Sequence, residues 1–270
     1  MELSSLNVKI TRSAAPFWMA AVSILMSAAN GLAQFGGPPP GPPPHVTGKA
    51  GAPVDLTGYW VSLVTEDWRY RMATPPKGDY ASVPLNQEGH KVADSWDPAK
   101  DDAAGGQCKV YGAAGLMRLP GRLHITWQDD EALKLETDAG TETRVFSFTT
   151  PEGQPGDWQG VSTASWDRPV STMGFSFGLG SDSALTGGSL KVITTKMKPG
   201  YLRKNGVPYS ADTTLTEYYD RFDIPNGESL LVITSEIVDP VYLARPFWTS
   251  THFKKQNDAS GWNPSSCSAK

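Results

Sequence analysis

Glu66 is the residue whose type and setting most favour acid–base chemistry. It lies in residues 56–72, where alternating side chains predict one long β-strand. On one face of that strand, Glu66 would lie among Trp60, Trp68 and Tyr70. A carboxyl group among aromatic rings loses hydration, and this raises its pKa toward values useful for proton transfer. The alternative interpretation is structural, with the carboxylate paired to an arginine or placed at a solvated barrel mouth.

Histidines are the other candidate proton acceptors, because imidazole titrates near neutral pH. His124 falls on the polar face of a strand predicted over residues 121–128, beside Arg122. This face is either an outer surface or, if the barrel interior is partly polar, the wall of a cavity. We predict that Glu66 and His124 are the catalytic residues. The same two interpretations apply to His252.

The candidate ligand-binding residues are aromatic, arginine and histidine side chains. Guanidinium groups match planar anions such as carboxylates or phenolates, and aromatic rings supply apolar binding surface. Arginines on strands are also ordinary surface residues, which is the alternative for this set. The predicted ligand-binding residues are Trp60, Trp68, Tyr70, Arg71, Tyr111, Arg122, Tyr209 and His252.

The sequence contains no recognisable motif for a metal site or a serine nucleophile. There is no HExxH pair and no GxSxG elbow, and the acidic run over residues 94–102 lacks calcium-loop spacing and is interpreted as a solvated turn. A site assembled from His124, His252 and a distant carboxylate is the alternative that spacing leaves open. We predict no metal and no cofactor.

Cys108 and Cys267 are the two cysteines, and in an oxidising compartment they most simply form one disulfide. The bridge would fasten the C-terminal tail to the body of the protein. A catalytic thiol at Cys108 is the alternative, but no base is adjacent to it in the sequence.

Residues 1–33 have the pattern of a secretory signal. Lys9 and Arg12 precede a short apolar run over residues 14–29, and small residues follow up to Ala33. An uncleaved anchor is the alternative, although the run is shorter than the roughly 20 residues that span a bilayer. Residues 34–53 are a Pro/Gly-rich linker. We predict a periplasmic or secreted protein with no membrane span after signal removal.

The net charge of −4 and the absence of a basic cluster argue against nucleic acid as a partner. We predict a small hydrophobic or aromatic molecule as the partner. The oligomeric state cannot be inferred from the sequence. Residues 54–270 are long enough for a single β-barrel domain.

Short strands separated by turn residues dominate this domain. One short helix is predicted over residues 87–96, and a long Gly/Ser-rich loop covers residues 150–188. Further strands are predicted over residues 121–128, 132–137, 141–148, 189–197, 215–222, 230–238 and 249–254, with one more inside the loop region. The fold class is all-β: an antiparallel lipocalin-like barrel, or a strongly curved sandwich, of about eight or nine strands.

Two patches of sequence support this fold through a resemblance. The first patch is Asp55-Leu56-Thr57-Gly58-Tyr59-Trp60. The second is LTEYYDRF over residues 215–222, followed by DPVYLARPFWTSTHFKK over residues 239–255 and by Trp262. Together they resemble uncharacterised exported bacterial proteins of lipocalin-like β-barrel type. Gly58-Tyr59-Trp60 is also similar to the GxW opening of the lipocalin superfamily, whose Trp packs across the barrel base. The resemblance implies a barrel and an exported protein, and it supplies no catalytic residues.

These observations leave three functional hypotheses. The first is an enzyme without a cofactor, of lyase or isomerase type, that moves a proton on a small hydrophobic or aromatic molecule bound in the barrel. The second is a periplasmic carrier that uses the same cavity without catalysis. The third is an envelope interaction module. The sequence favours the enzyme slightly, because a buried carboxylate is costly for a passive carrier of apolar ligands.

Overall fold

The computed structural model describes residues 45–149, 156–167 and 188–269. The chain divides into two compact units, Met1–His45 and Val46–Lys270, and the second holds every helix and strand of the described residues. The predicted signal and most of the Gly/Ser-rich loop lie outside the described residues. No helix in the described ranges combines the length and apolar character needed to cross a bilayer.

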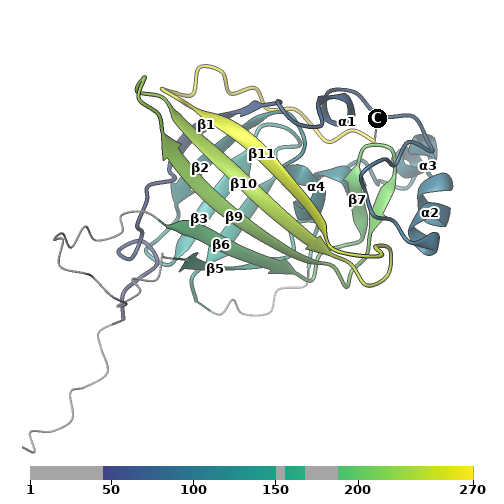
Figure 1. Cartoon of the computed structure of the whole chain (residues 1–270), viewed down its shortest axis with the longest axis horizontal. Coiled ribbons are helices and arrows are strands. Elements are labelled where there is room, and N and C mark those ends of the chain that lie inside the picture. The colour runs from purple at the N-terminus through teal and green to yellow at the C-terminus, as the bar shows by residue number, and fades with distance from the viewer. Residues whose placement is uncertain (1–44, 150–155, 168–187, 270) are drawn as a thin grey trace, which may run out of the picture. The chain divides into compact units, whose positions relative to one another are not determined.

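Nine strands of the described residues close into a barrel (Figure 1). They are β1 Gly58–Leu63, β2 Arg122–Trp127, β3 Ala132–Thr137, β4 Thr143–Ser147, β5 Val161–Asp167, β6 Ser189–Thr195, β9 Thr214–Asp223, β10 Ser229–Val238 and β11 Phe247–Gln256. Around the barrel their order is β1, β11, β10, β9, β6, β5, β4, β3, β2. The prediction of an all-β barrel is confirmed, and the number of strands agrees with it.

One pair of neighbouring strands, β4 and β5, runs parallel, whereas the other pairs are antiparallel. The prediction of a purely antiparallel barrel is therefore wrong at this pair. Parallel neighbours cannot be joined by a tight hairpin and need a crossover connection. The sequence between these strands has no regular pattern from which the direction of β5 could be inferred.

Short helices and one hairpin gather toward one end of the barrel and form a cap (Figure 1). The cap elements are α1 Trp68–Met72, α2 Gln87–Asp94, α3 Pro98–Ala103, the 3-10 helix η1 Lys109–Tyr111, α4 Ala113–Leu116, β7 Gly200–Arg203 and β8 Val207–Tyr209. The cap has its own apolar cluster, which includes Leu202, Val207 and Tyr209. The predicted helix over residues 87–96 corresponds to α2, and the prediction of only one helix is wrong.

Helix α3 begins where the sequence predicted a helix stop. The Asp97 carboxylate accepts the Ala99 N–H at 3.0 Å, and Pro98 takes the first helical position, where its missing N–H costs nothing. Asp101, predicted on a solvated turn, is buried and lies 2.5 Å from Lys109 Nζ. Most of the acidic run thus belongs to helix α3 and its N-cap, and Asp101 places a buried carboxylate in the cap of the barrel.

Strand β1 ends at Leu63, so the predicted long strand over residues 56–72 is wrong in its second half. The backbone of Asp67 is left-handed, with φ 49°, and helix α1 follows it directly. Trp68 is 66 % exposed, whereas Arg71 on the same helix is buried. The alternation of side chains beyond Leu63 therefore reflects a turn and one helical turn, and not two faces of a strand.

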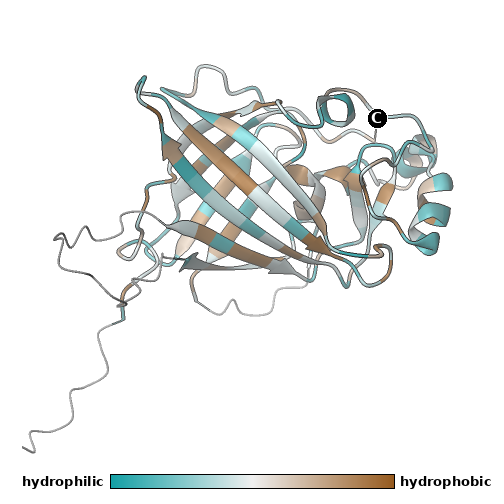
Figure 2. Cartoon of the chain, in the orientation of Figure 1, coloured by the Kyte–Doolittle hydropathy of each residue, from teal (hydrophilic) through white to brown (hydrophobic). Residues whose placement is uncertain are grey.

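Hydrophobic and hydrophilic residues alternate along the barrel strands (Figure 2), and in β2, β9 and β10 buried positions alternate with more exposed ones. In β2, Leu123 and Ile125 are buried, whereas His124 between them is only partly covered. The polar face that carries His124 is therefore the outer face of the barrel. It does not line a cavity.

A charged pair lies inside the barrel. Arg144 Nη2 donates to Glu217 Oε2 at 2.6 Å and Arg144 Nη1 donates to Glu217 Oε1 at 3.1 Å, while Thr194 Oγ1 accepts a further bond at 3.1 Å. The side chains of Arg144 and Glu217 have no exposed surface. Burial alone would lower the pKa of Arg144, but the facing carboxylate raises it above its ordinary value. A bidentate pair of this kind is the arrangement that makes a buried guanidinium tolerable.

Large apolar side chains enclose this pair on the inner face. Trp60, Phe146 and Tyr219 are fully buried, and the guanidinium of Arg144 lies 4.9 Å from the centre of the Phe146 ring. A cavity large enough for a ligand would expose the side chains that line it. The barrel interior is therefore packed around these residues.

We expect Arg144→Met to lower the free energy of unfolding by about 3–5 kcal/mol, because it leaves the Glu217 carboxylate buried and unpaired. The double variant Arg144→Met, Glu217→Leu should recover most of this loss, since it removes both charges. Urea unfolding followed by tryptophan fluorescence measures both variants. A loss below about 1 kcal/mol in the single variant, the range of exposed pairs, would contradict this assignment.

The predicted disulfide is confirmed, with Cys108 bonded to Cys267 across 159 residues of sequence. Glu142 Oε1 lies 3.4 Å from Cys267 Sγ, so a carboxyl group lines the bridge. Burial raises the pKa of Glu142, a hydrogen bond from Gln159 lowers it, and nearby Asp157 raises it further, for a net upward shift. The folded protein therefore holds the Glu142 proton more tightly than the unfolded chain does.

This upward shift predicts a specific pH dependence. The contribution of Glu142 to stability is fully present below about pH 4.3, the ordinary value, and is lost as the pH rises through the raised pKa. Glu142→Gln should remove this pH-dependent contribution. The unfolding free energy of the wild type, relative to that of the variant, should therefore fall as the pH rises through the raised pKa of Glu142. Urea unfolding at a series of pH values measures it.

Glu228→Gln is the matched control, because a hydrogen bond from Lys254 lowers the pKa of the exposed Glu228. That carboxylate contributes stability above its ordinary pKa and loses it as the pH falls, so its variant should show the opposite slope. Equal slopes for the two variants would refute the assignment for Glu142.

Candidate functional site

The candidate site lies where β1 ends against β11, on the capped side of the barrel. Leu63, the last residue of β1, is paired with His252 of β11. After Leu63 the chain turns, and this turn brings Thr65 and Glu66 to the imidazole of His252. Two segments far apart in the sequence thus meet because the barrel closes at this seam.

Both imidazole nitrogens of His252 have partners. Nδ1 lies 2.8 Å from Thr65 Oγ1 and 3.1 Å from Glu66 Oε2, and the Thr65 hydroxyl donates to Glu66 Oε2 at 2.8 Å. On the other side, Nε2 lies 3.2 Å from Ser250 Oγ. Since a carboxylate only accepts and the Thr65 proton is already used, Nδ1 has to carry the imidazole proton. Nε2 then holds a lone pair toward the Ser250 hydroxyl, which donates to it.

Glu66 is fixed from its other side by Arg71. Arg71 Nη1 forms an ion pair with Glu66 Oε1, Nη2 donates to Ser62 Oγ at 3.2 Å, and Nε donates to the Arg118 carbonyl oxygen at 3.0 Å. Burial lowers the pKa of Arg71, the Glu66 carboxylate raises it, and neighbouring Arg118 lowers it again, for a net downward shift. The alternative interpretation from the sequence, in which Glu66 pairs with an arginine, therefore describes part of the arrangement.

This order of groups, carboxylate to imidazole to hydroxyl, is suited to proton transfer. The carboxylate fixes the tautomer of His252 and stabilises its protonated form, which leaves Nε2 as the base. Ser250 and His252 are partly exposed on the outer face, so a substrate can reach them. Trp248, two residues before Ser250 on the same face, is 54 % exposed and lies about 7 Å along the strand.

His124 and Glu66, the predicted catalytic pair, are not brought together. His124 is paired with Tyr59 near the other end of β1, and the two rings stack with their centres 4.1 Å apart. The carboxylate next to His124 Nδ1 is that of Glu136, at 3.1 Å. His124 and His252 thus each lie beside a carboxylate, and of these two, His252 also has a serine hydroxyl on its second nitrogen.

Of the predicted ligand-binding residues, Arg71 and His252 lie in the Glu66 cluster. Trp60 is buried in the barrel core, where its Nε1 donates to the Leu56 carbonyl at 3.0 Å. Tyr111 and Tyr209 are buried in apolar clusters, and burial raises the pKa of both phenols.

The other predicted positions are spread over the surface of the cap and barrel. Trp68 is exposed on α1, and Tyr70 lies under the guanidinium of Arg203, whose carbon is 4.3 Å from the ring centre. Arg122 forms an ion pair with Asp138 at 3.7 Å. The aromatic side chains predicted to surround one ligand thus belong to separate regions.

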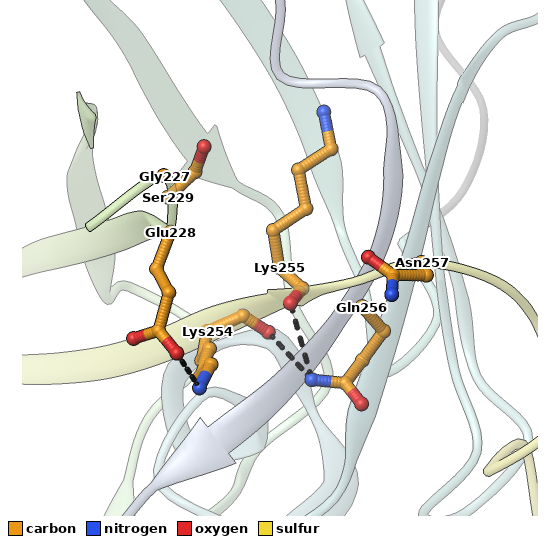
Figure 3. A pocket seen from close by; sticks show the side chains of 7 residues that line it. All are labelled: Gly227, Glu228, Ser229, Lys254, Lys255, Gln256 and Asn257. Carbon is orange, nitrogen blue, oxygen red and sulfur yellow. Dashed lines mark hydrogen bonds and ion pairs between the residues drawn. The ribbon is translucent and has the colours of Figure 1, made fainter. Parts of the chain in front are cut away.

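A second site lies at the barrel end where β9 turns into β10 and β11 ends (Figure 3). This pocket of about 430 Å³ is lined by Gly227, Glu228, Ser229, Lys254, Lys255, Gln256 and Asn257. Lys254 is ion-paired with Glu228, and Lys255 Nζ lies 5.5 Å from the centre of the Trp60 ring. Both amines already have partners, so this pocket offers a polar surface and the seam site offers the stronger acid–base chemistry.

Metal ligands are scarce in the described residues. The single group of His, Cys, Asp or Glu atoms close enough to hold an ion there is formed by Cys108, Glu142 and Cys267. Both sulfurs of this group belong to the disulfide and are not thiolate ligands.

Thr65 and Ser250 were not among the predicted site residues. The sequence does place Ser250 and His252 two positions apart on one strand face. Their connection to Glu66 depends on the pairing of β1 with β11, which no local pattern specifies. Comparison of the chain with family models, curated protein sequences and solved structures finds no match.

We predict that neutral His252 carries its proton on Nδ1. The 15N chemical shifts of the labelled imidazole at about pH 8, above the ordinary histidine pKa, distinguish the two tautomers. The double variant Thr65→Val, Glu66→Met removes both acceptors and should move the proton toward Nε2. An Nε2–H tautomer in the wild-type protein would contradict the proposed hydrogen-bond order.

Proposed function

We propose that the protein is an exported enzyme that moves a proton on a small hydrophobic or aromatic molecule without a cofactor, as a lyase or isomerase does. The observation that supports this proposal is the set of partners of the His252 imidazole. Its Nδ1 lies next to Glu66 and Thr65, and its Nε2 lies next to Ser250. A base with a fixed tautomer and a partly exposed lone pair is the minimum that such chemistry requires.

In this proposal His252 Nε2 accepts a proton from the substrate, and the Ser250 hydroxyl gives up its hydrogen bond as the substrate enters. The imidazolium that forms is stabilised by the Glu66 carboxylate. The proton then returns to another atom of the substrate in an isomerase, or to the leaving group in a lyase. Arg71 acts as a positioning residue, because its guanidinium is engaged with Glu66, Ser62 and a backbone carbonyl.

The site lies on the outer face of the barrel, next to an exposed aromatic ring, and this setting suits an apolar substrate. Trp248 is exposed beside Ser250, and an exposed Trp offers stacking area for an aromatic or hydrophobic molecule. The packed barrel interior supports the same placement, since the inner side chains around Arg144 are fully buried. Export is supported by the signal-like N-terminal sequence and by the disulfide, which persists in oxidising compartments.

The test is a screen of small aromatics, fatty acids and sugars against the purified protein, by melting temperature and by product analysis in D2O. A substrate should gain deuterium or be converted. His252→Gln should lower kcat/KM by about 10²–10⁴-fold, the usual contribution of a general base, and Glu66→Gln should lower it as well.

His124→Gln is the matched control, because it removes the other partly exposed histidine that lies beside a carboxylate. It should leave conversion unchanged. Conversion that depends on His124 and not on His252 would refute the site. A ligand that raises the melting temperature without conversion or deuterium uptake would refute the enzyme and indicate a carrier.

A further inference from the structure

Three arginines of the cap line one small cavity. Arg71 of α1, Arg118 after α4 and Arg203 of β7 border a space of about 10 Å³. Their exposed fractions are 3 %, 6 % and 3 %. Tyr70 and Lys204 also line this space, and four of its nine lining residues are therefore cationic.

The carboxylates in contact with this arginine cluster do not balance its charge. Glu66 pairs with Arg71, and Asp67 Oδ2 lies 2.6 Å from Arg118 Nη2. Arg203 donates to neutral groups, the Ala81 carbonyl at 2.8 Å and the Ser82 hydroxyl at 2.9 Å. Within the described residues, no carboxylate forms an ion pair with Arg203.

Two nitrogens of the arginine cluster also lack hydrogen-bond partners. Arg118 Nη1 and Arg203 Nε are buried and have no acceptor among the described residues. A buried N–H without an acceptor loses its hydration and gains nothing in return, and a buried unpaired charge is costlier still. A single anion in the cavity would compensate the unpaired positive charge and would accept hydrogen bonds from these two nitrogens.

Burial is the main cause that lowers the pKa values of two of these arginines, and repulsion between guanidinium groups adds to it. For Arg203, burial lowers the pKa, and Arg118 lowers it further, against weaker opposing effects of Asp67 and Asp79. For Arg71, burial lowers the pKa, Glu66 raises it, and Arg118 lowers it again.

We infer that the arginine cluster binds one small monovalent anion, a halide ion, between Arg118 Nη1 and Arg203 Nε. The volume sets the size, since about 10–15 Å³ of such space holds roughly one water molecule. Polyatomic anions such as sulfate, phosphate or an organic carboxylate are too large for the cavity as it stands.

The experiment is a titration of the purified, disulfide-bonded protein in gluconate buffer at constant ionic strength, with chloride or sulfate added. We expect a saturable rise in melting temperature with chloride, in the form expected for a ligand that binds only the folded state. Sulfate should give no saturable rise. Chloride binding is read independently from the line width of the 35Cl resonance.

Arg203→Met removes the charge that lacks a carboxylate partner, and Arg203→Lys keeps a charge but loses the Nε donor. Both should raise the half-saturating anion concentration by about tenfold or more, as the loss of a charge-assisted hydrogen bond would. Arg221→Met is the matched control, because Arg221 is ion-paired with Asp223 on the barrel and does not line the cavity.

Two results would overturn the inference. One is a wild-type protein in which chloride acts no differently from sulfate. The other is an Arg203→Met protein that is folded by circular dichroism and keeps the full saturable response. Neither result depends on enzymatic activity, so this test is separate from that of the proposed function.

Discussion

The pairing of β1 with β11 is the constraint on which the site depends. It joins residues 58–63 to the last barrel strand and removes the two edges that an open sheet would leave exposed. The same register places Leu63 opposite His252. A shift of one residue would turn His252 toward the interior and carry it away from Glu66. The closure that stabilises the fold therefore also sets the acid–base geometry.

Two buried arginines of this protein differ in the partners of their guanidinium groups. Arg144 inside the barrel has a bidentate carboxylate partner and is enclosed by aromatic rings. Arg203 in the cap is almost as deeply buried but has only neutral acceptors. The charge of Arg144 is thus compensated by a carboxylate, although its Nε has no acceptor among the described residues. Within the part of the chain that the structure describes, the charge of Arg203 has no carboxylate partner, and this difference favours an anion site in the cap over one in the barrel.

The sequence predicted the barrel because alternation with period two is a local signal, and it located strands such as β3 and β10 closely. It failed after Leu63, since one helical turn and a left-handed Asp67 leave the same short pattern of polar and apolar residues. Glu66 was identified for its carboxyl group among rings, yet its actual partners are Arg71 and His252. Such partners depend on long-range register, which composition and spacing do not encode.

Arg71 connects the seam site to the arginine cluster, because one guanidinium contacts Glu66 and also borders the cavity. Each of its three nitrogens already donates one hydrogen bond, so an anion in the cavity would act on it mainly through charge. An anion would weaken the repulsion from Arg118 that now lowers the pKa of Arg71. The guanidinium would then hold Glu66, and through it the imidazole, at a smaller electrostatic cost.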